Sequence, residues 1–166
     1  MSDNSRGPLR NAALAEFRHN LRTPVNHLLG YAELLIEEAA EMRNARALDA
    51  LRQIHSAARA TLTHVNELLS DRESVGDDIL EEVFTSVRPR TDRIENCLDA
   101  LRDDEAMETP EEWREDLERI RSAVQSLRDV LGNSREHASA APVSIEPRRR
   151  KGSGPRLLMR AKVSNP

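Results

Sequence analysis

Apolar residues recur along this chain at alternating steps of three and four, the period of a helix face that packs against a partner. The first such stretch runs from about residue 9 to 42, and the second from about 45 to 69. The apolar stripe of the first stretch consists of Leu14, Phe17, Leu21, Val25, Leu28, Ala32, Leu35, Ala39 and Met42. Its one departure from strict alternation spans Pro24, which predicts a bend within a continuing helix.

The boundary between these two stretches is weakly marked, because residues 43–46 contain neither glycine nor proline. One unbroken helix is therefore an alternative. At 1.5 Å per residue it would be about 90 Å long and would need a partner along its whole length. We expect two antiparallel helices instead.

A polar, glycine-containing segment at residues 70–78 separates this pair from a second pair of helices. The third helix is predicted over about 79–101, and it contains Pro89. Aromatic residues make up only 2% of the chain, and Ala, Leu, Glu and Arg dominate it. This composition favours helices over sheets. The expected fold class is therefore all-α, with antiparallel helical hairpins forming a four-helix bundle.

The fourth helix carries signals at both ends. Thr109 is the predicted N-cap, Pro110 the first helical residue, and Glu112 follows the cap by three residues, which is the pattern of a capping box. Gly132 and Asn133 are predicted to end the helix as a C-cap.

The two halves of the chain are similar. Residues 51–57 and 117–123 share Leu, Ile, Ser and Ala at the same offsets, and each segment follows a long helix with a proline in its first part. We infer an internal repeat of helical hairpins, residues 9–70 and 78–133. The pair can form a monomeric bundle within one chain. The alternative is a homodimer in which each hairpin pairs with its mate from a second chain.

The net charge of −4 is unevenly distributed. From Arg148 onward the chain carries seven basic residues and no acidic one, while the preceding 147 residues carry 18 basic and 29 acidic residues. An acidic body binds nucleic acid poorly, so no nucleic-acid partner is expected. Residues 134–166 are predicted to be a disordered linker or tail, and residues 1–8 a flexible N-terminus. The basic run 148–151 is expected to be solvated, with a nucleic-acid or membrane patch as the alternative.

The remaining composition points to a cytoplasmic protein. Cys97 is the single cysteine, so no internal disulfide can form, which fits a reducing compartment. No apolar run reaches the ~18 residues of a membrane span, and residues 1–10 lack the apolar core of a signal peptide. Cys97 lies on an apolar stripe and is expected in the core. No two histidines have the i, i+4 spacing of a helical metal site, so no metal is expected.

His19 lies on the side of the first helix opposite its apolar stripe, two residues after Phe17 and two before Leu21. The residues three, four, seven and eight positions further on share that side: Arg22, Thr23, Asn26 and His27. A neutral imidazole nitrogen is a nucleophile near physiological pH, and attack on phosphorus requires an accessible one. An exposed helix histidine is more often an ordinary surface residue.

The sequence around His19 indicates a functional role and not that of an ordinary surface residue. Residues 17–26, Phe-Arg-His-Asn-Leu-Arg-Thr-Pro-Val-Asn, resemble the phosphoacceptor box of the histidine-kinase dimerisation and phosphoacceptor (HisKA) domain. The family pattern is His, an acidic residue, Leu-Arg-Thr-Pro and an aliphatic residue. Residues 28–35 and 54–58 are also similar to that family. The resemblance covers residues 9–70 well, and residues 78–133 only as architecture.

The resemblance implies a role for each matching position. His19 would be the phosphorylated residue, and Thr23 would help to orient a water that dephosphorylates a partner. Arg22 would help to position the phosphate, and Pro24 would bend the helix just beyond the site. Asn20 stands where the family has Glu or Asp, thought to act as a base during phosphorylation from ATP. Because Asn cannot take a proton, this departure weakens the case for autophosphorylation more than the case for exchange with an aspartyl phosphate.

No Gly-rich phosphate loop is present in the chain, and no second α/β domain is predicted. A complete kinase carries its ATP-binding domain after the first hairpin, where this chain has its second hairpin. ATP and Mg²⁺ are therefore expected only through a partner kinase domain, and the chain itself is not expected to be a self-sufficient kinase. The second hairpin is a degenerate copy, with Val87 and Arg88 near the position where a histidine would be.

Two functions follow as alternatives. In the first, the chain is a phosphorelay module of two-component signalling, in which His19 exchanges phosphate with the aspartate of a response-regulator receiver domain. In the second, it is a non-catalytic dimerisation or docking module that regulates a signalling partner. The intact Leu-Arg-Thr-Pro favours the first function, while Asn20 and the missing ATP-binding domain favour the second. His27 is a candidate partner contact, His55 and His64 are expected to have packing or surface roles, and His137 lies in the predicted tail.

Overall fold

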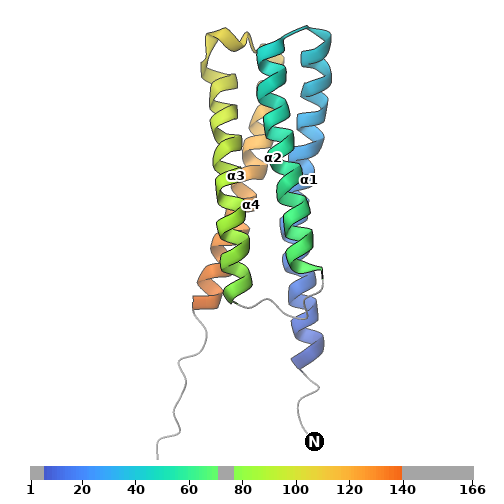
Figure 1. Ribbon diagram of the computed structural model, residues 1–166, viewed down its shortest axis with the longest axis vertical. Helices are drawn as coiled ribbons and strands as arrows, with labels where there is room; N and C mark the ends of the chain where they lie inside the picture. Colours follow the sequence, from blue (N-terminus) through green and yellow to red (C-terminus); the bar gives the residue numbers. More distant parts are fainter. Residues whose placement is uncertain (1–5, 71–76, 140–166) are drawn as a thin grey trace, which may run out of the picture.

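The computed structural model describes residues 6–70 and 77–139, which form a bundle of four long helices (Figure 1). These are α1 (Arg6–Glu41), α2 (Ala45–Leu69), α3 (Asp77–Asp103) and α4 (Arg114–Ser139). Two short 3₁₀ helices, η1 (Glu105–Met107) and η2 (Glu111–Trp113), connect α3 to α4. The described residues contain no strand, so the predicted all-α fold is confirmed.

Consecutive helices run antiparallel, and each packs against two neighbours (Figure 1). α1 lies between α2 and α4, and α3 lies between the same two helices. Leucine, isoleucine, valine and alanine side chains from all four helices form one continuous core along the bundle. No helix among the described residues is both long enough and apolar enough to cross a membrane.

The buried positions of the first hairpin recur 66 residues further along the chain, as from Leu14 to Leu80 and from Leu51 to Leu117. The equivalent buried positions of α1 and α3 include Phe17 and Val83, Leu21 and Val87, Leu28 and Ile94, and Leu35 and Leu101. Between α2 and α4 they include Ile54 and Ile120, Ala57 and Ala123, and Val65 and Leu131. Applied to His19, this spacing gives Thr85, and not Val87 or Arg88, as the equivalent position.

The first two helices are separate, as predicted. Arg43 adopts a left-handed conformation with φ 57°, which reverses the chain after α1. Asn44 then caps α2, because its side-chain oxygen accepts a hydrogen bond from the Ala47 N–H at 3.1 Å. Its side-chain amide donates to the Met107 carbonyl at 2.7 Å. One residue therefore starts α2 and ties it to the connection between α3 and α4.

The predicted capping box at the start of the fourth helix is wrong. A 3₁₀ turn begins at Glu111, α4 begins only at Arg114, and the buried hydroxyl of Thr109 has no hydrogen-bond partner among the described residues. The cause is tertiary packing. Trp113 is 2% exposed, and its indole N–H donates to the Glu38 carboxylate at 2.6 Å, so the direction in which the chain enters α4 is set by the core.

The predicted end of that helix is also wrong. α4 continues through Gly132 to Ser139, and no described glycine has a positive φ. Glycine permits a left-handed C-cap but does not require one. Residues 134–139, including His137, therefore belong to a helix and not to a tail. The flexible N-terminus predicted over 1–8 is wrong for residues 6–8, which belong to α1. Pro8 lies in the first turn, where a missing N–H breaks no helical hydrogen bond. Residues 1–5 and the basic tail at 140–166 lie outside the described residues.

α1 continues through Pro24, whose ring is buried in the bundle, and α3 continues through Pro89. The bend expected at Pro24 stays a prediction. Cys97, expected in the core, is half-buried and packs against it. Burial raises the pKa of its thiol, and the positive charge of Arg93 acts in the opposite direction.

Candidate functional site

His19 is an exposed residue of α1, while Phe17 and Leu21 on either side of it are buried. The helix therefore fixes the backbone through two core contacts and presents the imidazole to solvent. Asn20 is exposed beside it. This is the accessibility that in-line attack on a phosphoryl group requires.

Thr23 is a polar neighbour of the His19 ring. Its hydroxyl donates to the His19 backbone carbonyl at 2.9 Å, and its oxygen lies 3.5 Å from Nε2 of the same residue. The contact with Nε2 is at the outer limit of a hydrogen bond. Thr23 therefore favours one orientation of the His19 ring but does not fix it.

Pro24 changes the backbone at the site. Because proline has no N–H, the carbonyl of Asn20 lacks its helical hydrogen bond from residue 24. The Asn20 carbonyl, in the residue next to His19, therefore accepts no helical hydrogen bond from residue 24. The Pro24 ring is buried, so the helix stays packed against the core at this point.

The Arg22 side chain reaches across to α2. Its Nε donates to the Asn66 side-chain oxygen at 2.8 Å, and Arg18, one turn earlier, donates to the Ser70 carbonyl at 3.3 Å. Both arginines thus hold α1 to the last turns of α2. The bond from Arg22 uses one of its five N–H donors, so a phosphate-positioning role for Arg22 stays a prediction.

A shallow hollow of about 360 Å³ opens beside Thr23, between α1 and α4. From α1 it is lined by Thr23, Pro24, His27 and Tyr31. From α4 it is lined by Arg119, Ser122, Ala123 and Ser126. His27 is therefore on the same side of α1 as Thr23, as the spacing predicted. The α4 residues were missed, although the internal repeat could have indicated them once the helix neighbours were known.

The charge on the α4 side of this hollow is already compensated. Arg119 forms ion pairs with Glu115 and Asp116, the latter at 3.0 Å. Its guanidinium also lies 5.4 Å from the centre of the Tyr31 ring. The surface next to Thr23 is therefore polar but not strongly cationic.

The other described histidines hold the bundle together or lie on its surface. His55 Nε2 is 2.9 Å from a Glu33 carboxylate oxygen, which links α2 to α1. His64 Nδ1 is 4.0 Å from Glu67 on the same helix. Within the described part of the chain, no group of three His, Cys, Asp or Glu side chains is placed to hold a metal ion.

Comparison with known proteins finds the cell-division control histidine kinase PdhS of Brucella ovis, Brucella canis and Brucella abortus. Each is 33% identical to this chain over 124 residues, which is 74% of the chain. This chain is related to a segment of a histidine kinase. The match covers 11% of the length of each kinase. No protein-family model matches this histidine-kinase-related chain, and no solved structure does.

Proposed function

We propose that this chain is a cytoplasmic phosphotransfer module of two-component signalling, in which His19 exchanges a phosphoryl group with the aspartate of a receiver domain. The observation that carries the proposal is the exposed His19, whose Nε2 lies 3.5 Å from the Thr23 hydroxyl oxygen. Thr23 belongs to the Leu-Arg-Thr-Pro segment that begins two residues after His19. The relationship to a histidine kinase supports the same class of chemistry.

In the proposed reaction a neutral nitrogen of His19 attacks the phosphorus of an aspartyl phosphate. A nitrogen–phosphorus bond forms, the bond between phosphorus and the aspartyl oxygen breaks, and the aspartate carboxylate leaves. The reverse step returns the phosphoryl group to the receiver. A nucleophile on a rigid helix needs only an exposed, oriented ring for this step, since the receiver supplies the second half of the site.

The receiver would dock over the exposed side of α1 and the hollow beside it. Thr23 and His27 line the α1 side of that hollow, and Ser122 and Ser126 line the α4 side. Small polar side chains leave room for a partner helix to approach, and they can form hydrogen bonds to it. His27 is thus proposed as a partner contact and not as a nucleophile.

The phosphate donor would be a phosphorylated receiver or a separate kinase domain that binds ATP and Mg²⁺. Asn20 favours the first donor, because its side chain can form hydrogen bonds but cannot accept the proton that a carboxylate would. The same residue also favours a second candidate function, that of a docking module that no longer carries phosphate.

One experiment separates the two functions. The chain is incubated with receiver domains that have been labelled with radioactive acetyl phosphate, and acid-labile label on the chain is measured. Phosphotransfer predicts label on the wild type and on His27→Gln but none on His19→Gln. A docking module predicts binding of a receiver without any label.

A further inference from the structure

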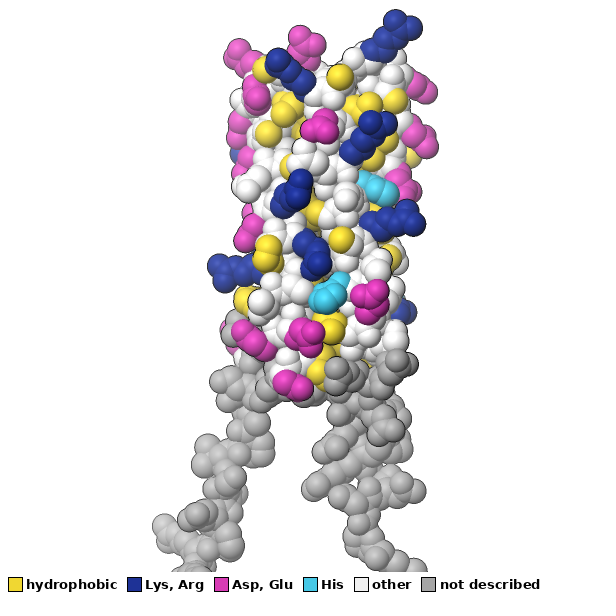
Figure 2. All heavy atoms as spheres, viewed as in Figure 1, with side chains coloured by type: hydrophobic (Ala, Val, Ile, Leu, Met, Phe, Trp, Pro, Cys, Tyr) yellow, Lys and Arg dark blue, Asp and Glu magenta, His cyan; other side chains and the backbone are white. Residues whose placement is uncertain are grey.

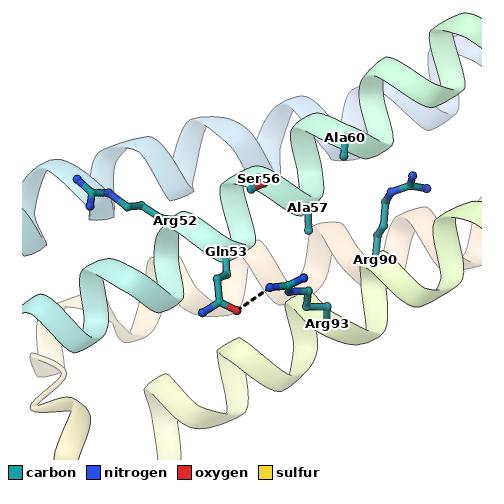
Figure 3. A pocket seen from close by; sticks show the side chains of 7 residues that line it. All are labelled: Arg52, Gln53, Ser56, Ala57, Ala60, Arg90 and Arg93. Atoms are coloured by element: carbon teal, nitrogen blue, oxygen red, sulfur yellow. Dashed lines mark hydrogen bonds between the residues drawn. The ribbon is translucent and has the colours of Figure 1, made fainter.

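A second hollow, of about 310 Å³, lies between α2 and α3 and is not lined by His19 (Figure 3). Ser56, Ala57 and Ala60 of α2 are small residues that leave space in it, and Arg52 and Gln53 of the same helix complete that side. α3 contributes Arg90 and Arg93. We call this site the arginine hollow.

The arginine hollow corresponds, through the internal repeat, to the α1/α4 hollow beside Thr23. Ser56 and Ala57 stand 66 residues before Ser122 and Ala123, which line the α1/α4 hollow. Arg90 and Arg93 stand 66 residues after Pro24 and His27. The small residues are thus retained in both hollows, while Pro24 and His27 of α1 are replaced by two arginines of α3.

The arginines of this hollow differ from other arginines of the bundle in their contacts with acids. Among the described residues none of Arg52, Arg90 and Arg93 forms an ion pair, whereas Arg102, Arg121 and Arg128 elsewhere on the bundle each do. Arg93 donates to the Gln53 side-chain oxygen at 3.1 Å, and Arg90 donates to a carbonyl of its own helix. The Gln53 amide in turn donates to Asp49 at 2.8 Å, so the nearby carboxylate is held by a neutral group.

The same distribution is visible on the surface. Figure 2 shows dark-blue arginine side chains over the middle of the face formed by α2 and α3, while most of the Asp and Glu side chains lie along its edges and at its lower end. In Figure 3 the Arg93 side chain extends to Gln53 at the centre of the hollow, and Arg52 and Arg90 lie toward its two ends. The positive charges are therefore spread along the hollow and do not converge on one point.

We propose that the arginine hollow binds a small molecule that carries at least two linked phosphoryl groups. The planar fork of a guanidinium matches two oxygens of one phosphoryl group, and arginines placed apart suit a ligand with more than one such group. The hydroxyl of Ser56 adds a donor between them. The volume is at the lower end of the range for small-molecule sites, which fits a diphosphate better than a protein segment.

The test is a calorimetric titration of the whole chain with inorganic diphosphate and, separately, with ADP, at two salt concentrations. Binding of both probes places recognition in the diphosphate, and binding of ADP alone shows that the nucleoside contributes. Either result supports the proposal if Arg93→Gln and Arg90→Gln each weaken binding by about tenfold or more, the usual effect of losing a charge-assisted hydrogen bond. Arg59→Gln is the matched control, because Arg59 is an exposed residue of α2 that does not line the hollow.

His19→Gln should bind both probes as the wild type does, which separates this inference from the phosphotransfer function. Helical circular dichroism checks that each variant is folded. The proposal is overturned if neither probe binds, if Arg59→Gln weakens binding as much as Arg93→Gln does, or if only an acidic peptide binds in an Arg93-dependent manner.

Discussion

The Thr23 hydroxyl oxygen lies 2.9 Å from the backbone carbonyl oxygen of His19 and 3.5 Å from Nε2 of its ring. A hydroxyl has a single hydrogen, and the shorter contact shows that it is donated to the carbonyl. The oxygen facing Nε2 can then only accept. Thr23 is thus held by the backbone one turn beyond His19, with its hydroxyl oxygen beside the His19 ring.

Replacing Thr23 by Ala should affect hydrolysis of the receiver's aspartyl phosphate more than phosphoryl transfer to His19. The variant keeps the exposed His19, so transfer from a labelled receiver should stay within about threefold of the wild type. Loss of the hydroxyl should slow hydrolysis of the receiver's aspartyl phosphate by about tenfold or more, as expected when a group that positions water is removed. Release of inorganic phosphate measures the second rate. Thr63→Ala, at an exposed position of α2, should change neither rate. Equal hydrolysis with the two variants would contradict the role given to Thr23.

Replacing Asn20 by Glu should restore a proton acceptor beside His19. With ATP, Mg²⁺ and a separate kinase domain, phosphorylation of the chain should rise by about a hundredfold, within the range for general-base catalysis. Transfer from a phosphorylated receiver should be unchanged, because that step does not depend on the carboxylate. Asn26→Glu places the same charge at another exposed position of α1 and is the control. An increase of similar size in the control would show that added charge, and not a base, is responsible.

Trp113 and Glu38 connect the start of α4 to α1, and this connection should be visible in stability. Trp113→Ala should cost about 3–5 kcal/mol of unfolding free energy, because it removes a buried aromatic ring. Trp113→Phe keeps most of the apolar contact and loses the indole hydrogen bond to an exposed carboxylate, so its cost should be about 1–2 kcal/mol. Urea unfolding followed by circular dichroism measures both. A cost below about 1 kcal/mol for the alanine variant would show that the core does not depend on this ring.

The faces of the helices were predictable from the sequence because burial in a bundle follows the helical period. The predicted stripe from Leu14 to Ala39 is buried, and only Met42, just beyond the end of α1, is 54% exposed. The ends of α4 were not predictable. The packing of Trp113 against Glu38 replaced the local cap at Thr109, and no left-handed turn formed at Gly132.

The site divides in the same way. The exposure of His19 and the shared side of Thr23 and His27 follow from spacing along one helix. The contact of Arg22 with Asn66 and the contribution of Ser122 to the hollow depend on which helices are neighbours. Spacing along one helix shows which face of the helix each residue lies on, but not which neighbouring helix packs against that face.

The most direct test of the central claim is the transfer of labelled phosphate from receiver domains to the wild-type chain, to His19→Gln and to His27→Gln. The account predicts acid-labile label on the wild type and on His27→Gln, and none on His19→Gln, with all three proteins equally helical. Label that persists on His19→Gln would contradict the account.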